Sequence, residues 1–501
     1  MSRTTLPGRM RRNVVVLCLD AVRADTFAAR ASRLSDLADV RVTGCRTAGG
    51  WTAPAHASML TGLLAHDHGV HARSPRYDSL DPADTLVGDL DGHAVGVSAT
   101  PHAGSASGFD RLFDEFHDVT RSRPDPRGFD ARAVADEADG RIGRRIHLVR
   151  EALAHDAPGA SLANAARAAA DRLARGGTLG HEPAVLDDGA RAVARLLRDR
   201  VTETERDAPV FAFADFAEAC APLVDRRGLV RGTVPRGWSS ADAGLTPEAV
   251  VADPDEYVEE LAFYRHLYAE NVAYLDRVCA DLVADLREAT ERETTVVVTA
   301  DHGENLFDDP DDPAFGHVGS LSEAVLHVPF VLVDPPAGYP PVVDGLASHL
   351  DFRALVRGLA ADETPGLTAE GDPESGDVAG DERAVAAELV GVAPGGEALA
   401  ARDPERWDRV RRAVYPHDAA KLCWDDRGER TEYELDPDDP CRQRRVATGT
   451  GGAPGWAEAV FGEPVAETDE RTRRGGDAGA DGRDRTDDAD RRADPREVGS
   501  R

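Results

Sequence analysis

The chain has 501 residues, enough for one large domain with a smaller one beside it. Asp and Glu number 91 against 59 Lys and Arg, a formal net charge of −32, and no basic patch stands out, so we expect no nucleic-acid partner. No stretch reaches the roughly 20 apolar residues of a membrane-spanning helix, so we expect no membrane insertion. The Asp-rich composition, with Lys421 as the only lysine, is typical of halophilic proteins, although a GC-rich genome would also explain the preference for arginine.

The six cysteines are scattered along the chain without a Cys-x-x-Cys pair: Cys18, Cys45, Cys220, Cys279, Cys423 and Cys441. This spacing predicts neither a disulfide framework nor a zinc ribbon. Residues 1–12 are basic, but the apolar run after them is too short for the hydrophobic region of a signal peptide. We therefore expect a cytoplasmic location.

The first apolar run, residues 14–19, contains three β-branched side chains and predicts a buried parallel strand. Asp20 ends the run. Ligands of open α/β sheets bind beyond the carboxyl ends of the strands, so Asp20 lies where a metal ligand is expected. A helix cap is the alternative role for Asp20, and we would favour it if the two segments described next were absent.

The second segment, residues 49–54, predicts a loop that enters a helix, with Thr52 as the N-cap and Pro54 in the first turn. Residues 55–64 continue with apolar side chains at helical spacing. A helix N-terminus offers free amide donors and partial positive charge to a phosphate or sulfate group. A Thr52 hydroxyl that also binds a metal ion would be a stronger nucleophile than a free alcohol. An ordinary capped helix is the alternative.

The third segment, residues 294–299, is a β-branched run that predicts another strand. Asp301 and His302 follow it directly and would present two metal ligands at the strand end. Gly303 would allow a tight turn after them. Because Asp-His-Gly alone is a weak signal, a turn with surface Asp and His is the alternative.

The order of strand and helix signals predicts a catalytic α/β domain over residues 13–365, with a largely helical insertion at residues 117–205. Residues 363–383 are rich in Gly, Asp, Glu and Pro and predict a linker or long loop. A small α+β subdomain is expected at residues 384–460, and the Asp-, Arg- and Gly-rich tail, residues 467–501, is expected to be disordered. The remaining predicted elements are a helix capped by Ser161, a helix around residues 190–197, strands at residues 210–214 and 330–333, and a helix through residues 264–275.

In this order the three segments resemble the sulfatase family of the alkaline phosphatase superfamily. That family opens with an Asn-hydrophobic-Asp strand, as in residues 13–20. It continues with a Cys/Ser-x-Pro-x-Arg helix start that leads into Ala-Ser-Leu-Leu-Thr-Gly, as in residues 52–62, and later has Asp-His-Gly, as in residues 301–304. Weaker similarities occur at residues 107–114, 274–276, 316–317, 326–330 and 433–437. The resemblance extends from about residue 13 to about residue 445, and the acidic composition is similar to that of haloarchaeal members.

The resemblance implies an alkaline-phosphatase-like fold, with a mixed, mainly parallel sheet flanked by helices and a small C-terminal subdomain. It implies that Asp20, Asp301 and His302 bind a divalent metal ion, which would be Ca²⁺, Mg²⁺, Mn²⁺ or Zn²⁺. Thr52 aligns with the nucleophile and would also touch the metal. His56 aligns with an arginine of the family, and His317 aligns with a histidine that contacts the transferred group or assists the leaving group.

The departures from the family pattern bear on the chemistry. Sulfatases convert Cys or Ser to formylglycine, which Thr52 cannot form because its β-carbon carries a methyl group. A Thr ester must instead be opened by water or an acceptor alcohol, which favours a phosphate ester over a sulfate ester. Ala21 replaces a second Asp, and Cys220 lies where relatives have a substrate-binding His. No lysine lies near the Asp-His motif, so the metal, the helix dipole, His or Arg must neutralise the anion.

We therefore expect a sulfatase-like hydrolase or transferase that acts on a sulfate or phosphate ester of a small molecule or polymer. The alternative is a catalytically silent relative that binds an anionic ligand or scaffolds a polymer pathway. A phosphomutase of the same superfamily is a third reading, disfavoured by the similarity at residues 433–437. Five other histidines are expected to be structural: His66, His68, His71, His102 and His349. His66, His68 and His71 could instead hold a metal ion, and His102 could line the mouth of the pocket.

Overall fold

The structure is a computed structural model. It describes residues 9–119, 123, 125–131, 134, 141–175, 189–223, 233–235, 238–310, 313–368, 385–436 and 439–462. The described residues belong to one compact unit, residues 1–462. The tail predicted to be disordered and most of the predicted linker lie outside the described residues.

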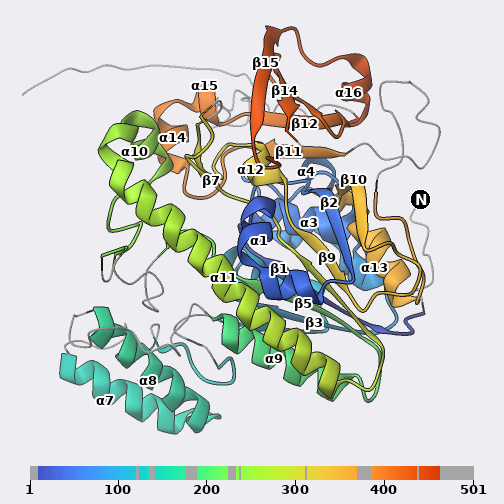
Figure 1. Cartoon of the computed structure of the whole chain (residues 1–501). Coiled ribbons are helices and arrows are strands. Elements are labelled where there is room, and N and C mark those ends of the chain that lie inside the picture. The colour runs from blue at the N-terminus through green and yellow to red at the C-terminus, as the bar shows by residue number, and fades with distance from the viewer. Residues whose placement is uncertain are drawn as a thin grey trace, which may run out of the picture. The chain divides into compact units, whose positions relative to one another are not determined.

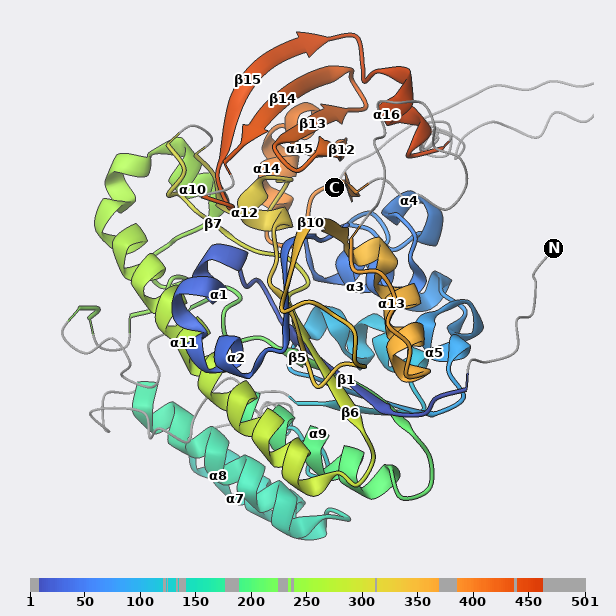
Figure 2. The same cartoon turned by 45° about the vertical axis from the view of Figure 1, so that its right-hand side comes forward.

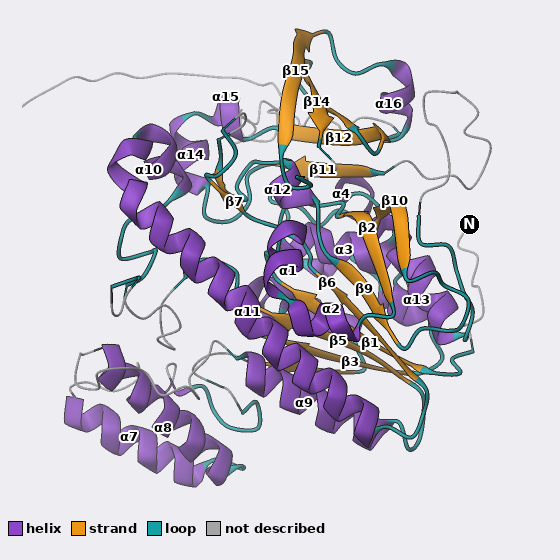
Figure 3. Cartoon of the chain, in the orientation of Figure 1, coloured by secondary structure: helices purple, strands orange, loops and turns teal. Residues whose placement is uncertain are grey.

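The centre of the molecule is an eight-stranded sheet (Figures 1 and 3). Its strands are, in spatial order, β10 (Val342–Ser348), β2 (Val40–Arg46), β9 (Phe330–Val333), β6 (Thr294–Thr299), β1 (Asn13–Leu19), β5 (Val210–Phe216), β3 (His93–Ser98) and β4 (Glu115–Asp118). Seven of these strands run in one direction, and β9 runs antiparallel to both of its neighbours. The predicted mixed, mainly parallel sheet is confirmed.

The central position of β1 follows from its composition. All seven of its residues are buried, as expected for a strand covered on both faces. The Asn13 side chain fixes the start of the strand, since it donates to Glu205 at 2.8 Å and accepts from the backbone of Val210 at 2.9 Å. β1 pairs in parallel with β5 and β6, so the carboxyl ends of these three strands lie side by side.

Helices cover both faces of this sheet (Figure 2). One layer contains α1 (Ala24–Arg30), α2 (Ser32–Leu37), α9 (Ala190–Thr204) and the long helix α11 (Val258–Ala289). The opposite layer contains α3 (Thr52–Thr61), α5 (Leu86–Asp89) and α13 (Phe352–Ala360). None of the helices in the described part of the chain combines the length and the apolar composition needed to cross a bilayer.

The predicted insertion contains two kinds of helix. The helices α7 (Arg141–Ala154) and α8 (Pro158–Arg175) pack against each other around a small cluster that includes Phe129 and Leu148. In contrast, α9 packs against β3 and β5 and belongs to the layer that covers the sheet. The predicted helix cap at Ser161 is wrong: Ser161 lies inside α8, where its hydroxyl accepts from the backbone of Phe129 at 3.2 Å.

The C-terminal region forms an antiparallel sheet of five consecutive strands, in keeping with the predicted small α+β subdomain: β11 (Ala386–Val390), β12 (Val410–His417), β13 (Ala420–Asp425), β14 (Glu429–Leu435) and β15 (Gln443–Thr450). The helices α14 (Glu397–Arg402), α15 (Pro404–Trp407) and α16 (Gly455–Ala459) accompany it. The other short elements are α4 (Ala65–His68), α10 (Pro247–Ala252), α12 (Glu323–Leu326), the strand pair β7 (Asn305–Leu306) and β8 (Phe315–Gly316), and 3₁₀ turns at Tyr77–Ser79, Pro82–Asp84, Pro101–Ala103, Ser105–Ser107, Phe109–Leu112, Pro254–Tyr257 and His349–Asp351.

Candidate metal and nucleophile site

The predicted ligands converge where β1 and β6 end. Asp20 follows β1, while Asp301 and His302 follow β6, and all three side chains are completely buried. Because the two strands are parallel neighbours, their carboxyl ends deliver these side chains to one place. His302 Nε2 lies 3.5 Å from Asp20 Oδ1 and 3.6 Å from Asp301 Oδ2. Asp20 caps no helix, since Arg23 is the N-cap of α1.

Thr52 adds a fourth atom to this group from the start of α3. The predicted N-cap role of Thr52 is wrong, because Trp51 is the N-cap and Thr52 is the first helical residue. The Thr52 hydroxyl lies 3.5 Å from His302 Nε2. Thr52 Oγ1, Asp20 Oδ1 and Asp301 Oδ2 therefore lie at nearly equal distances from one imidazole nitrogen.

The lone pairs of these atoms are arranged for a cation. Among the described residues, no hydrogen-bond donor reaches Asp20 Oδ1 or Asp301 Oδ2. The second oxygen of each carboxylate is occupied: Asp20 Oδ2 accepts from Thr100 at 3.1 Å, and Asp301 Oδ1 accepts from the backbone of Ala21 and His302. His302 Nδ1 donates to the carbonyl oxygen of Gly303 at 2.8 Å, which leaves the lone pair on Nε2.

The spacing of the four atoms also fits a metal ion. Ligand atoms bound to one Zn²⁺ at about 2.0–2.2 Å in a tetrahedron stand about 3.4 Å apart, and adjacent ligands of Ca²⁺ at about 2.4 Å stand about as far apart. The observed separations from His302 Nε2 are 3.5 and 3.6 Å. The residues present therefore fit a divalent ion, and they do not distinguish between zinc and calcium.

The site brings buried carboxyl groups together, and a positive charge beside them would stabilise their ionised form. Burial, followed by the charges of Asp301 and Asp215, raises the pKa of Asp20 well above its usual value. Burial likewise raises the pKa of Asp301. Within the described part of the chain, the ion pairs of Asp20 and Asp301 involve only histidines. Burial lowers the pKa of His302 to about 3, so its imidazole is neutral, as a metal ligand must be.

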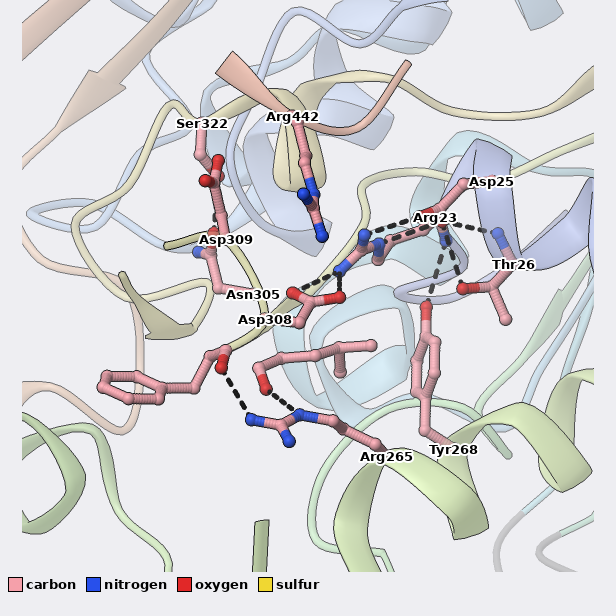
Figure 4. A network of polar contacts seen from close by, with 12 residues as sticks. Arg23, Asp25, Thr26, Arg265, Tyr268, Asn305, Asp308, Asp309, Ser322 and Arg442 are labelled. Atoms are coloured by element: carbon pink, nitrogen blue, oxygen red, sulfur yellow. Dashed lines mark hydrogen bonds and ion pairs between the residues drawn. The ribbon is translucent and has the colours of Figure 1, made fainter. Parts of the chain in front are cut away.

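Ala21 has a structural role that its side chain does not suggest. Its backbone is left-handed, with φ +63°, an uncommon conformation for a residue other than glycine. The Tyr268 hydroxyl holds this turn by donating to the carbonyl oxygen of Ala21 at 2.7 Å. It also accepts from the backbone of Arg23 at 3.0 Å (Figure 4). The turn in turn directs the Ala21 amide to Asp301 Oδ1, at 3.2 Å. Ala21 thus supports a ligand through its backbone.

Two arginines, the buried Arg23 and the half-buried Arg265, hold the segment after His302 (Figure 4). The Arg23 guanidinium donates to Asp25 at 2.6 Å and to both oxygens of Asp308 at 3.0 Å. Arg265 on α11 donates to the carbonyl oxygens of Leu306 and Phe307. These contacts attach the chain beyond Glu304 to α11 and to the loop after β1.

Gly303 lies where the backbone after His302 passes too close to Ala324 to leave room for a side chain. The backbone at residues 302–304 forms no turn, so the predicted reason for this glycine, a tight turn, is wrong, and its φ lies outside the left-handed region. A β-carbon at Gly303 would lie only 2.1 Å from the carbonyl oxygen of Ala324. The absence of a side chain allows the backbone after His302 to approach α12 closely.

His317 lies at the partly exposed edge of the site, with 17% of its side chain accessible. Its ring centroid is 4.5 Å from that of His302, and its Nδ1 forms a 2.9 Å hydrogen bond with Glu304 Oε2. Burial alone would lower the pKa of His317, but the charge and the hydrogen bond of Glu304 outweigh burial and raise it. With Nδ1 occupied by Glu304, Nε2 is the nitrogen available to a substrate.

His56 lies deeper than the other predicted residues and is completely buried. Its Nε2 is 3.4 Å from Cys18 Sγ and 4.0 Å from Asp301 Oδ2. Its ring stacks on Phe109 and meets Phe213 edge-on. Burial lowers the pKa of His56 to about 4, so the imidazole is neutral.

The sequence reasoning missed four residues that the structure places here: Cys18, Thr100, Asp215 and Glu304. Asp215 lies at the end of the apolar strand β5, as Asp20 follows β1, and the same signal would have found it. Burial and the charge of Asp301 raise the pKa of Asp215 to about 8. Thr100 had no such signal, because it reaches Asp20 from the loop after β3.

The other histidines pair with protein groups. His68 forms a 3.1 Å hydrogen bond with Ser58, and His66 forms a 2.8 Å hydrogen bond with Glu388. His349 forms a 3.0 Å hydrogen bond with Thr299. His102 lies edge-on to Trp51 at 5.7 Å. The metal-ligand groups found among the described residues include none of these histidines.

Comparison with known proteins agrees with this geometry. Residues 233–361, which contain Asp301, His302 and His317, match the model of the Sulfatase family. This part of the chain is similar to the Sulfatase family. A comparison with curated proteins finds no match.

Solved structures share the fold over most of this sulfatase-like chain. A phosphonate monoester hydrolase from Silicibacter pomeroyi aligns with a TM-score of 0.54 and 17% identity, covering 87% of this chain and 91% of that chain. A phosphonate monoester hydrolase of Agrobacterium radiobacter gives 0.53 and 17%, covering 86% and 90%. A putative sulfatase from Bacteroides thetaiotaomicron gives 0.51 and 14%, covering 87% of each chain. At these identities the likeness shows the fold.

Proposed function

We propose that this protein is a metal-dependent hydrolase or transferase that acts on a phosphate or sulfate ester through Thr52. One observation carries the proposal: Thr52 Oγ1 lies among the atoms of Asp20, Asp301 and His302 that are free to bind a cation. The names of similar structures, phosphonate monoester hydrolase and putative sulfatase, support the same class of reaction.

Asp20, Asp301, His302 and Thr52 would hold the ion. When bound, a divalent ion neutralises developing charge and lowers the pKa of a hydroxyl that it touches. The first turn of α3 offers backbone amides and the positive end of the helix dipole to the non-bridging oxygens of the ester. Thr52 therefore lies where an anionic ester group can be bound and attacked.

The proposed reaction has two steps. The Thr52 hydroxyl gives its proton to solvent, and its oxygen forms a bond to phosphorus or sulfur while the bond to the leaving oxygen breaks. His317 Nε2 gives that leaving oxygen a proton. Glu304 orients the imidazole through Nδ1 and stabilises its protonated form. Water or an acceptor alcohol then attacks the Thr ester and gives a proton to His317 Nε2, which restores the acid, while the released Thr52 oxygen takes a proton from solvent. Since this ester has no aldehyde-forming exit, we favour phosphate esters as substrates.

The test uses aryl phosphate, aryl phosphate diester, aryl phosphonate and aryl sulfate substrates with each divalent metal in high salt. We expect Thr52→Ala to lose at least about 10³-fold in kcat/KM, as typically follows removal of a nucleophile. Thr61→Ala is the matched control, because Thr61 lies on the same helix and donates to the carbonyl of Ala57. Full activity in Thr52→Ala would rule out the role of Thr52.

A silent, anion-binding relative is the second candidate. Two observations favour it: the carboxylates pair only with histidines in the described structure, and the Cys220 thiol interacts with Asp20 where relatives bind substrate. In that case folded, metal-loaded protein would bind phosphate or sulfate in calorimetry yet turn over none of the substrates.

A further inference from the structure

A second group of potential ligands lies beside the first. Cys18 comes from β1, Asp215 from β5 and His56 from α3, and all three are completely buried. One ligand atom from each residue lies within 4.8 Å of the other two. The proposed reaction uses none of the three.

The fold brings these side chains to one face of the sheet. Cys18 and Asp215 are direct partners in the parallel pairing of β1 and β5, so their side chains point to the same side. Phe213, two residues before Asp215, shares that side and packs against the His56 ring at 5.2 Å. α3 places His56 over this pair, with Nε2 at 3.4 Å from Cys18 Sγ.

Two carboxylate oxygens at this group accept no hydrogen bond from the described residues. Asp215 Oδ2 accepts from Ser98 at 3.3 Å, whereas Asp215 Oδ1 has no hydrogen-bond donor among the described residues. Asp301 Oδ2 is likewise without a donor and lies 4.0 Å from His56 Nε2. A completely buried carboxylate oxygen without a partner is costly, and a bound cation removes that cost.

We propose that Cys18, His56 and Asp215 bind a second divalent ion next to the first, with Asp301 between the two. The thiolate, imidazole and carboxylate set selects a thiophilic ion of the Zn²⁺ type. A sulfur at about 2.3 Å and a nitrogen at about 2.0–2.1 Å from one tetrahedral zinc stand about 3.5 Å apart, close to the observed 3.4 Å. Binding releases the thiol proton of Cys18 to solvent.

Charge balance is compatible with two ions. With both ions bound, the carboxylates of Asp20, Asp215 and Asp301 and the Cys18 thiolate carry four negative charges, which two divalent ions offset completely. The inference goes beyond the proposed reaction and does not depend on it.

Metal content tests the proposal directly. Protein is stripped with a chelator, loaded with Zn²⁺ or Co²⁺ in high salt to screen weak binding by surface carboxylates, and dialysed before elemental analysis. We expect two ions per chain in the wild type and one in Cys18→Ala and in Asp215→Asn. In the cobalt form we expect a sulfur-to-cobalt charge-transfer band that Cys18→Ala lacks. Cys279→Ala is the matched control, because Cys279 is equally buried but lies on α11.

The two sites are separable. Asp20→Asn should lose one ion and the hydrolytic activity but keep the charge-transfer band. One ion per chain in the wild type, without a sulfur band, would overturn the second site while leaving the proposed hydrolysis intact. A band that persists in Cys18→Ala would overturn it as well. Circular dichroism establishes that each variant is folded, and the wild-type measurement stands even where a variant does not fold.

Discussion

Lys421, the only lysine in the chain, lies on β13 and is completely buried, and it offers a sharp test of the structure. Its Nζ lies 2.9 Å from Glu323 Oε1 and donates to the carbonyl oxygen of Leu321 at 2.9 Å. Glu323 also accepts from Arg46 Nε at 2.8 Å. Because Leu321 follows His317 by four residues, Lys421 ties the C-terminal sheet to the segment that carries the proposed acid.

We expect Lys421→Met to lower the free energy of unfolding by about 3 kcal/mol, since breaking a buried ion pair typically costs about 3–5 kcal/mol and Arg46 still pairs with Glu323. The pKa of Glu323 gives a similar magnitude. Burial raises it, but Lys421 and Arg46 outweigh burial and lower it from 4.5 to about 2. At about 1.4 kcal/mol per pKa unit, this preference for the charged form is worth ~3 kcal/mol.

The sign of the pH dependence follows from the lowered pKa. The stabilisation is fully present above about pH 4.5 and is lost as the pH falls toward about 2. In Lys421→Met the pKa of Glu323 moves back up, so acid should reduce the remaining stability at a higher pH than in the wild type.

The assay is urea unfolding followed by tryptophan fluorescence, with Glu323→Gln and the double variant completing a cycle. Arg33→Ala is the control, because Arg33 and Asp281 form an exposed pair at 3.0 Å, whose loss should cost under about 0.5 kcal/mol. A loss below about 1 kcal/mol in Lys421→Met, with an unchanged m-value, would refute the buried pair.

Three further predictions concern the metal ligands. Tyr268→Phe removes the hydroxyl that holds Ala21 and should weaken metal affinity about 10–100-fold; calorimetric titration with unchanged affinity would contradict this. Gly303→Ala should destabilise by at least about 2 kcal/mol in urea because of its contact with Ala324, whereas Gly159→Ala, with open space around it, should cost nothing; equal effects would contradict the steric reason. Chelation should lower the melting temperature, and adding the metal back should restore it. A free metal concentration of about 100 times Kd adds about 2.7 kcal/mol to the free energy of unfolding. An unchanged melting temperature would argue against a resident ion.

The strands and ligands that the sequence predicted share one property: their signal is local. An apolar β-branched run followed by an acidic residue marked both β1 with Asp20 and β6 with Asp301, because buried parallel strands end where ligands bind. Positions decided by tertiary packing were harder. Thr52 resembles an N-cap in sequence, but its hydroxyl turns to His302, and Ser161 resembles a cap but sits inside a helix.

The departures from the family pattern converge on one physical consequence. Ala21 removes a carboxylate, yet its backbone amide, held by Tyr268, still directs Asp301 to the site. His56, in place of an arginine, removes a permanent positive charge while Asp215 brings a further buried carboxylate close by. In the proposed function, bound cations would provide the neutralisation that basic side chains provide elsewhere. Occupancy by metal should therefore control the stability of this region as well as its chemistry, and a chelated protein should lose its fold around β1, β5 and β6 before the C-terminal sheet unfolds, which hydrogen exchange would resolve strand by strand.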